Sequence, residues 1–197
     1  MNKIRFCSDT AISWLLRVSV IFALILVTAC TTVPTVSDHV AQSSDFTRNG
    51  RFAINVQYHN GQRDAVQGGF SWVEVNQQLQ LDLHNPMGSI LARVMVSDNE
   101  AVLYRTDGST GQAADPDALV EQVLGSPIPV SKLRSWLRGE VANTAHNVTH
   151  SDSSPVSFSD DGWRVRLQRY DAYGPRLLVL NRNDSQSNIS VRLVIDQ

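Results

Sequence analysis

Hydrophobic and polar residues alternate along most of the chain beyond residue 50. The segment LQLDLH places Leu79, Leu81 and Leu83 on one face, and the segment ISVRLVI repeats the alternation at 189–195. A period of two is typical of half-buried antiparallel strands. The pattern predicts strands at 51–59, 65–75, 79–84, 90–97, 100–105, 145–150, 155–159, 163–170, 176–182 and 189–195.

Short runs of turn residues separate several of these segments. They read HNGQ, SDNE and SDDG, and they predict tight connections between consecutive strands. The chain has no repeated strand–helix unit, so a parallel nucleotide-binding sheet is not expected. We expect a mainly β fold in which about ten antiparallel strands form a sheet that must twist and curl.

Two short segments show helical spacing instead. In the first, Asp115 can cap the helix, Pro116 stands in its first turn and Gly125 follows its end. Its expected apolar face consists of Ala118, Leu119, Val123 and Leu124. The second runs over 129–138 and stops at Gly139, with Val130, Leu133, Trp136 and Leu137 at helical spacing. Such helices can plug one side of a curled sheet, whose concave face is then either filled by side chains or left as a cavity.

The N-terminus has the pattern of a secretory signal peptide. Lys3, Arg5 and Arg17 precede an apolar run at 18–27 that ends in small residues. A run of about ten residues is short of the roughly twenty that a membrane-spanning helix needs. We therefore predict a signal peptide at 1–29, in preference to a permanent transmembrane anchor.

The apolar run closes on LVTAC, which resembles the bacterial lipobox. In that motif the cysteine, here Cys30, becomes the lipidated first residue of the mature protein. The alternative is a plain signal peptide cleaved near Ala29, but no cysteine follows Cys30 with which it could form a disulfide. Thr31 stands where aspartate commonly retains bacterial lipoproteins at the inner membrane, so the outer membrane is the expected destination. We predict a lipidated N-terminus and flexible tether at 30–44 and a folded domain at 45–197.

Charge excludes one class of partner. Loss of residues 1–29 leaves 14 Lys and Arg against 18 Asp and Glu, a net charge of about −4. A protein that neutralises phosphates along a nucleic acid is normally basic. No nucleic-acid partner is expected.

Signals for catalysis are weak. The chain has no GxSxG, HExxH, P-loop or GxGxxG motif. His146 and His150 share a predicted strand without an evident third metal ligand, so surface histidines are expected. The spacing of an EF-hand is absent from the acidic residues Asp107, Asp115 and Asp117. Roles in turns and at a helix N-cap explain these residues. We predict no enzyme, no cofactor and no metal site; an esterase of unfamiliar layout is the weakest alternative.

An apolar residue stands at the tip of one predicted turn. In LHNPMGSI, Asn85 suits the first position of a type I turn, Pro86 the second and Gly88 the fourth. Met87 then lies third, on the outside of the bend. Turn tips are normally polar, although single exposed apolar residues are common.

Five segments together resemble the outer-membrane lipoprotein receptor family LolB, in order over almost the whole mature chain. They are GRFAI at 50–54, FSW at 70–72, LDLHNPMGS at 81–89, LGSPIPVSKLRSWLRG at 124–139 and GWRVRLQRY at 162–170. The resemblance implies a strongly curved antiparallel half-barrel, open, with a helical lid and a hydrophobic cavity. It also implies a receptor that takes lipoproteins from the periplasmic carrier LolA, shields their acyl chains and inserts them into the outer membrane.

The resemblance assigns roles to particular residues. The family projects an apolar residue, commonly leucine, from a loop reading NPLG; here Met87 holds that position, between Pro86 and Gly88, as a membrane-insertion loop. Strand parity then predicts the cavity wall, although a wall and a dry core use the same residue types. The expected acyl-chain cavity residues are Phe52, Phe70, Trp72, Leu79, Leu81, Leu83, Trp136 and Trp163.

The partners expected on this basis are a LolA-type carrier, cargo acyl chains and the outer membrane, with the receptor itself a monomer. The alternative function is a surface lipoprotein that acts as a structural or assembly module, with a packed core and no lipid-transfer role.

Overall fold

The computed structural model describes residues 45–98 and 100–196. The predicted signal peptide, tether and lipidated Cys30 lie outside these residues and stay predictions. Eleven strands form one antiparallel sheet. They are β1 (Phe46–Tyr58), β2 (Arg63–Val75), β3 (Gln78–His84), β4 (Ile90–Val96), β5 (Ala101–Arg105), β6 (Thr110–Ala113), β7 (His146–Ser151), β8 (Ser154–Asp160), β9 (Trp163–Asp171), β10 (Gly174–Asn183) and β11 (Ser187–Ile195).

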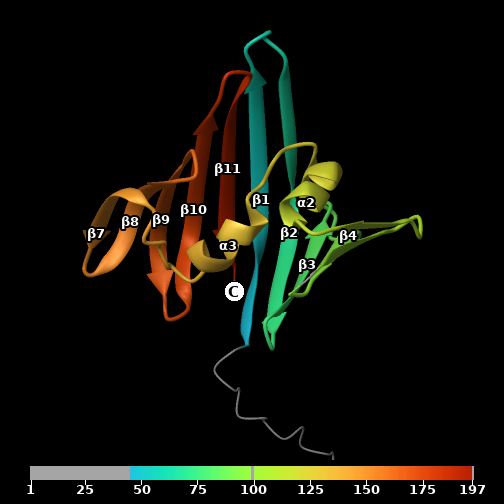
Figure 1. Ribbon diagram of the computed structural model, residues 1–197, viewed down its shortest axis with the longest axis horizontal. Helices are drawn as coiled ribbons and strands as arrows, with labels where there is room; N and C mark the ends of the chain where they lie inside the picture. The colour runs from blue at the N-terminus through green and yellow to red at the C-terminus, as the bar shows by residue number, and fades with distance from the viewer. Residues whose placement is uncertain (1–44, 99, 197) are drawn as a thin grey trace, which may run out of the picture. The chain divides into compact units, whose positions relative to one another are not determined.

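The sheet consists of two meanders, β1–β6 and β7–β11, which are joined by pairing of β1 with β11. Its order is β6-β5-β4-β3-β2-β1-β11-β10-β9-β8-β7, so the first and last strands are neighbours near the middle (Figure 1). Among the described residues β6 and β7 form the two edges and do not pair with each other, which leaves the sheet open. The expected open antiparallel fold with short helices is confirmed.

Ten of the strands agree with the alternation of the sequence, and their boundaries differ by two residues or fewer except at one end. β1 begins at Phe46 instead of residue 51, because Phe46 and Arg48 continue its buried inward face; an arginine at an inward position hides this part of the alternation. The eleventh strand, β6, is an addition: TGQA is short, contains glycine and has no apolar alternation, so its pairing with β5 is not visible in the sequence.

Several hairpins turn on two residues in the left-handed conformation. Asn76 and Gln77 join β2 to β3, and Asp161 and Gly162 join β8 to β9, all with φ between 49° and 78°. Such turns twist in the same sense as the strands they connect, and Asn, Asp and Gly tolerate them best. They fix the register that keeps the apolar residues of each strand on one face.

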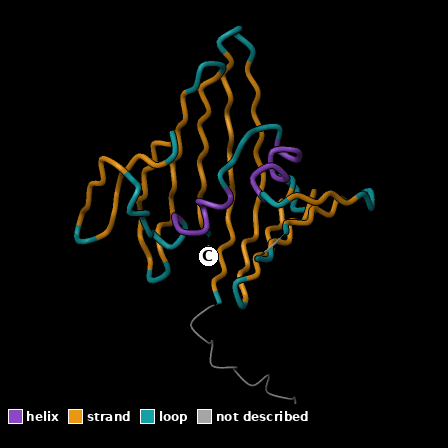
Figure 2. The backbone as a smooth tube through the Cα atoms, viewed as in Figure 1, coloured by secondary structure: helices purple, strands orange, loops and turns teal. Residues whose placement is uncertain are grey.

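Two helices connect the meanders and lie over one face of the sheet (Figures 1 and 2). Helix α2 (Pro116–Leu124) begins as predicted at Asp115, whose side chain accepts a hydrogen bond from the Asp117 backbone, and ends at Gly125 in the left-handed region. It buries Leu119, Val120 and Leu124, whereas Ala118 is exposed. The buried face of the helix therefore includes Val120 in place of the predicted Ala118.

Helix α3 (Val130–Trp136) is shorter than the predicted 129–138 but buries the expected residues. Val130, Leu133 and Trp136 face the sheet, and Leu137 just after the helix is fully buried. Trp136 meets Phe158 of β8 edge to face, with ring centroids 5.8 Å apart. The core thus lies between the two helices and the inward residues of the strands. Neither helix of the described part is long and apolar enough to cross a bilayer.

Candidate functional site

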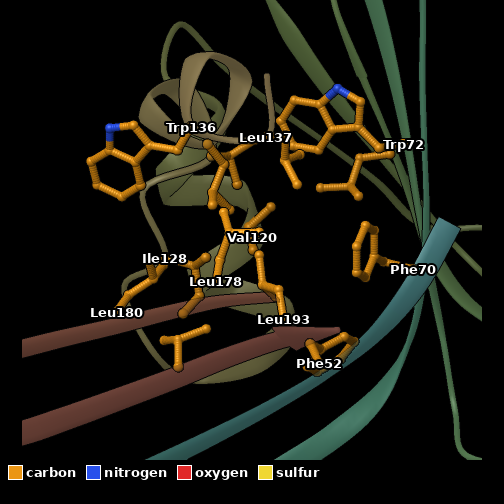
Figure 3. Packing of buried hydrophobic residues seen from close by; sticks show 14 of the residues in the cluster. Phe52, Phe70, Trp72, Val120, Ile128, Trp136, Leu137, Leu178, Leu180 and Leu193 are labelled. Carbon is orange, nitrogen blue, oxygen red and sulfur yellow. The ribbon is translucent and has the colours of Figure 1, made fainter. Parts of the chain in front are cut away.

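An apolar cavity lies between the helices and the middle of the sheet. Figure 3 shows Phe52, Phe70 and Trp72 of the sheet facing Val120 and Leu137 of the helical segment. All fourteen lining residues are apolar: Phe52, Ile54, Phe70, Trp72, Leu81, Leu83, Val120, Leu124, Ile128, Val130, Leu133, Leu137, Val191 and Leu193. The one hydrogen-bonding group among these side chains, the indole N–H of Trp72, already donates to Glu74, so none is left for a ligand.

The cavity is small. Its volume is about 40 Å³, whereas small-molecule sites usually measure roughly 300–1,000 Å³. Six of the fourteen lining residues come from residues 120–137, so the helical segment supplies almost half of the cavity wall.

Five of the eight predicted wall residues line this cavity: Phe52, Phe70, Trp72, Leu81 and Leu83. The other three, Leu79, Trp136 and Trp163, are buried in the same core but do not line the cavity. Strand parity identifies the inward face but not how far along a strand the hollow extends, which explains Leu79 and Trp163; Trp136 lies on α3 and packs against Phe158 instead.

Sequence reasoning missed nine of the lining residues. Val191 and Leu193 belong to this wall because β11 pairs with β1, placing Leu193 opposite Phe52 and Val191 opposite Ile54. Alternation marks these positions as inward, but nothing in the sequence indicates that the last strand joins the first. Alternation along β1 was the available signal for Ile54, and the apolar residues of 116–137 were the signal for the other six.

A charged cluster ties α3 to β2 beyond the apolar cavity. The carboxylate of Glu74, only 4% exposed, accepts hydrogen bonds from Trp72 Nε1 at 2.7 Å and from Arg138 Nη2 at 2.6 Å. Arg134 Nε lies 3.3 Å from the same carboxylate. Burial by itself raises the pKa of Glu74, but these hydrogen bonds and the two arginine charges outweigh it and hold the pKa below its ordinary value.

Two further ion pairs involve inward-facing residues of the sheet. Arg48, buried on β1, donates to both carboxylate oxygens of Asp171 at 2.8 Å. The hydrogen bonds from Arg48 lower the pKa of Asp171 to about 2 and outweigh the opposing effect of burial. Lys132 of α3 lies 3.3 Å from Asp160 of β8, so α3 is held to both meanders.

The turn between β3 and β4 presents Met87 to solvent. The Gly88 backbone donates to the Asn85 carbonyl at 2.9 Å, which confirms the predicted turn, and the Asn85 side chain accepts from the backbones of Met87 and Ser89. Three hydrogen bonds to Asn85 therefore fix a loop whose tip is 94% exposed. The rigid backbone keeps the thioether away from the rest of the protein.

A bulge beside this turn exposes two more apolar residues. The register between β3 and β4 shifts near His84, which pairs with Ile90 while Leu83 pairs with Ala92. The extra residue, Leu91, is 40% exposed, and Ile90 is 41% exposed. Bulges re-aim side chains in this way. Met87, Ile90 and Leu91 make the turn an apolar projection.

Comparison with known proteins identifies the family. A family model described as "Outer membrane lipoprotein LolB" matches residues 44–197. The chain belongs to this family.

Relatives named outer-membrane lipoprotein LolB support the assignment over nearly the whole chain. One from Bordetella petrii is 48% identical over 175 residues, which cover 87% of each chain. Another, from Bordetella pertussis, is 44% identical over 189 residues, which cover 94% of each chain. The family resemblance and the outer-membrane location expected from the sequence are confirmed.

Among solved structures, a LolA superfamily protein from Nitrosomonas europaea has a TM-score of 0.41 and 10% identity. The match covers 75% of this LolB-family chain and 83% of that protein.

The remaining polar candidates have structural roles in this LolB-family domain. Asp107 accepts from the Ser109 backbone in a turn, and Asp117 accepts from the backbone and hydroxyl of Ser131. Burial raises the pKa of Asp117. His146 and His150 are exposed on β7. Within the described residues, no three metal-ligating side chains gather at one place.

Proposed function

We propose that this protein accepts lipoproteins from a LolA-type carrier, shields their acyl chains in the cavity between helices and sheet, and inserts them into the outer membrane. The observation that supports this most directly is the cavity lined only by apolar residues. An acyl chain of about sixteen carbons costs on the order of 12 kcal/mol to expose to water, at roughly 0.8 kcal/mol per CH₂. A receptor must keep such chains covered throughout the transfer.

Loading requires the helical segment to move. Six residues of this segment contribute to the wall of a cavity of about 40 Å³. A cargo chain would replace the contacts that these side chains make with Phe70, Trp72 and Leu81, so apolar area stays buried in both arrangements. The hydrophobic part of the exchange is therefore small, and what remains is the cost of displacing the segment, which lowers the apparent affinity for the cargo chain.

The direction of cargo transfer follows from the relative affinities of the carrier, this protein and the bilayer for acyl chains. The receptor must bind acyl chains more tightly than the donor carrier and less tightly than the bilayer, so that each step runs downhill without a nucleotide. A cavity that its own side chains partly fill supports moderate affinity, because a ligand has to displace them first.

In this proposal, the Met87 turn inserts the lipoprotein cargo into the outer membrane. Asn85 holds the turn rigid, and Met87 with its neighbours Ile90 and Leu91 offers an apolar projection to hydrocarbon. Methionine keeps the size and apolarity of the usual leucine and adds flexibility. The lipidated N-terminus at Cys30 would hold the receptor beside its destination, since several acyl chains anchor stably where one does not.

The proposed activity is binding and transfer, carried out by a monomer without catalysis, cofactor or metal. The small cavity keeps the alternative open to test: a lipoprotein whose packed core has no lumen and which acts as an assembly module.

The deciding experiment mixes this protein with a lipidated protein held by a LolA-type carrier and separates the products. Cargo found with this protein, and then in added membranes, supports the receptor. Cargo that stays entirely with the carrier, while this protein remains folded, supports the assembly module instead.

A further inference from the structure

The sheet face opposite the helices carries a polar concavity of about 400 Å³. Six polar side chains line it, from four adjacent strands: Asn147, Ser157, Ser159, Arg164, Arg166 and Asn181. We call this concavity the outer-face pocket. Phe158 and Val165 alternate with its residues and are buried in the core, which places the six side chains on the outer face.

Strand register brings the pocket residues together. Ser157 lies opposite Arg166 and Ser159 opposite Arg164, and Asn181 of β10 lies on the other side of Arg164. The two arginines are two residues apart on β9, roughly 6.5 Å along the strand, so their long side chains can reach one point above the serines. Small serines form the floor and arginines the wall.

The opposite wall comes from an irregular part of β7. Asn147 has a φ of 55°, in the left-handed region, and lies where the pairing of β7 with β8 shifts register. This departure from regular strand geometry places Asn147 at the pocket. Its amide adds a donor on the side away from Arg166.

Most of these groups have no partner among the described residues. There, the side chains of Ser157, Ser159 and Arg166 form no hydrogen bond or ion pair. Arg164 Nη2 meets only the neutral amide oxygen of Asn183, at 3.2 Å in the amide orientation that satisfies both ends. The pocket therefore holds two positive charges and several donors with no described carboxylate lining it.

We propose that the outer-face pocket binds a phosphate group, either as the free anion or as a phosphate ester. Guanidinium groups offer paired donors that match phosphate oxygens, and serine hydroxyls and asparagine amides can complete a shell around a tetrahedral anion. Donors that converge from four strands exceed what one planar carboxylate can use. A phospholipid headgroup and free phosphate share this chemistry, and the site is independent of the apolar cavity on the other face.

The test uses the full chain as its host produces it, kept in a non-ionic detergent, with binding measured by titration calorimetry. The probes are inorganic phosphate and glycerophosphoglycerol, a phosphodiester headgroup without acyl chains that could enter the apolar cavity. We expect saturable binding of at least one probe that persists at about 150 mM salt, because converging donors are less sensitive to screening than a diffuse field. Tighter binding of glycerophosphoglycerol identifies a lipid headgroup as the source, and tighter binding of phosphate identifies the free anion.

Matched variants separate a pocket from general positive charge. Arg164→Gln and Arg166→Gln should each weaken binding by tenfold or more. Arg192→Gln removes the same charge from β11, on the same face but outside the pocket, and should change affinity less than twofold. Equal losses in all three variants, no saturable binding by the unaltered protein, or a glutamate-rich peptide that outcompetes both probes would each overturn the proposal.

Discussion

Trp72 and Glu74 lie two residues apart on the inward face of β2, and the indole Nε1 donates a hydrogen bond of 2.7 Å to Glu74 Oε1. The same carboxylate receives Arg138, whose guanidinium carbon lies 4.0 Å from the centre of the Phe46 ring. One buried acid therefore connects a cavity wall residue to the helical segment that covers the cavity. Removal of the Glu74 carboxylate should therefore destabilise the helical segment before the strands.

Glu74→Gln should loosen α3. The amide can still accept from Trp72, but it leaves two arginines without a charged partner, so the free energy of unfolding should fall by about 2 kcal/mol. Hydrogen exchange of residues 130–138 should become faster relative to the strands. Peptide-resolved exchange by mass spectrometry, together with chemical denaturation, measures both effects.

Asp82→Asn is the matched control for this change. Asp82 is also buried and pairs with Arg93 at 2.6 Å, but it lies on the outer face, away from α3. This variant should lose stability without a selective effect on residues 130–138. Equal protection of α3 in both variants would contradict the tie between Glu74 and the helix.

Leu81→Glu should weaken acyl-chain binding by tenfold or more, because ligand entry would bury an unpaired charge in a wall that has no free polar group. Displacement of a fluorescent fatty acid measures affinity, and circular dichroism confirms folding. The volume-conserving control Leu81→Met should bind within about twofold of the unaltered protein. Undiminished binding by a folded Leu81→Glu variant would remove Leu81 from the proposed site.

Met87→Glu should separate loading from insertion. The turn is fixed by Asn85 rather than by the Met87 side chain, so the fold and the cavity should be unaffected. Cargo should still pass from the carrier to this variant but remain in the supernatant when vesicles are sedimented. Met87→Leu should restore insertion, and normal insertion by the glutamate variant would exclude the tip from the mechanism.

The Arg48–Asp171 pair should make stability depend on pH at the acid end. The pKa of Asp171 is lowered from 3.8 to about 2 in the folded protein, so its contribution is present above about pH 4 and is lost as the pH falls toward 2. Because Asp171 is partly exposed, we expect a contribution on the order of 1 kcal/mol.

Urea denaturation at pH 7 and at several values between 4 and 2 checks this. Asp171→Asn should be less stable at pH 7 and should lose less on acidification than the unaltered protein. Asp64→Asn, at an exposed position of β2, should stay within about 0.5 kcal/mol of it at pH 7. An unchanged acid profile in Asp171→Asn would contradict the assignment.

Local patterns predicted most elements of this fold. Alternation located most of the ten predicted strands because they bury one face, although β7 is exposed throughout, and Asp115, Pro116 and Gly125 bounded α2 because caps act over a few residues. Long-range pairing was not predictable from such patterns. The pairing of Phe52 with Leu193 brings β11 into the cavity wall beside β1, and no property of either residue alone indicates this pairing.

The charged parts of the site were missed for a related reason. Arg48 and Glu74 are polar residues at inward positions, where alternation alone predicts apolar side chains. They are tolerated because partners arrive from distant segments: Asp171 from β9 for Arg48, and Arg134 and Arg138 for Glu74. The exposed Met87, in contrast, was predictable because a turn of four residues is a local structure.

The neighbourhood of β1 and β11 has a consequence for synthesis of the protein. Arg51 and Asp196, which form an ion pair across this seam, are 145 residues apart in the sequence. Until the last strand leaves the ribosome or the translocation channel, β1 keeps one side without its hydrogen-bonding neighbour, and the cavity wall lacks Val191 and Leu193. Contacts so distant in the chain form slowly and prolong exposure to aggregation. The proposed shelter for the acyl chains of other proteins is thus complete only after the last strand has paired with the first.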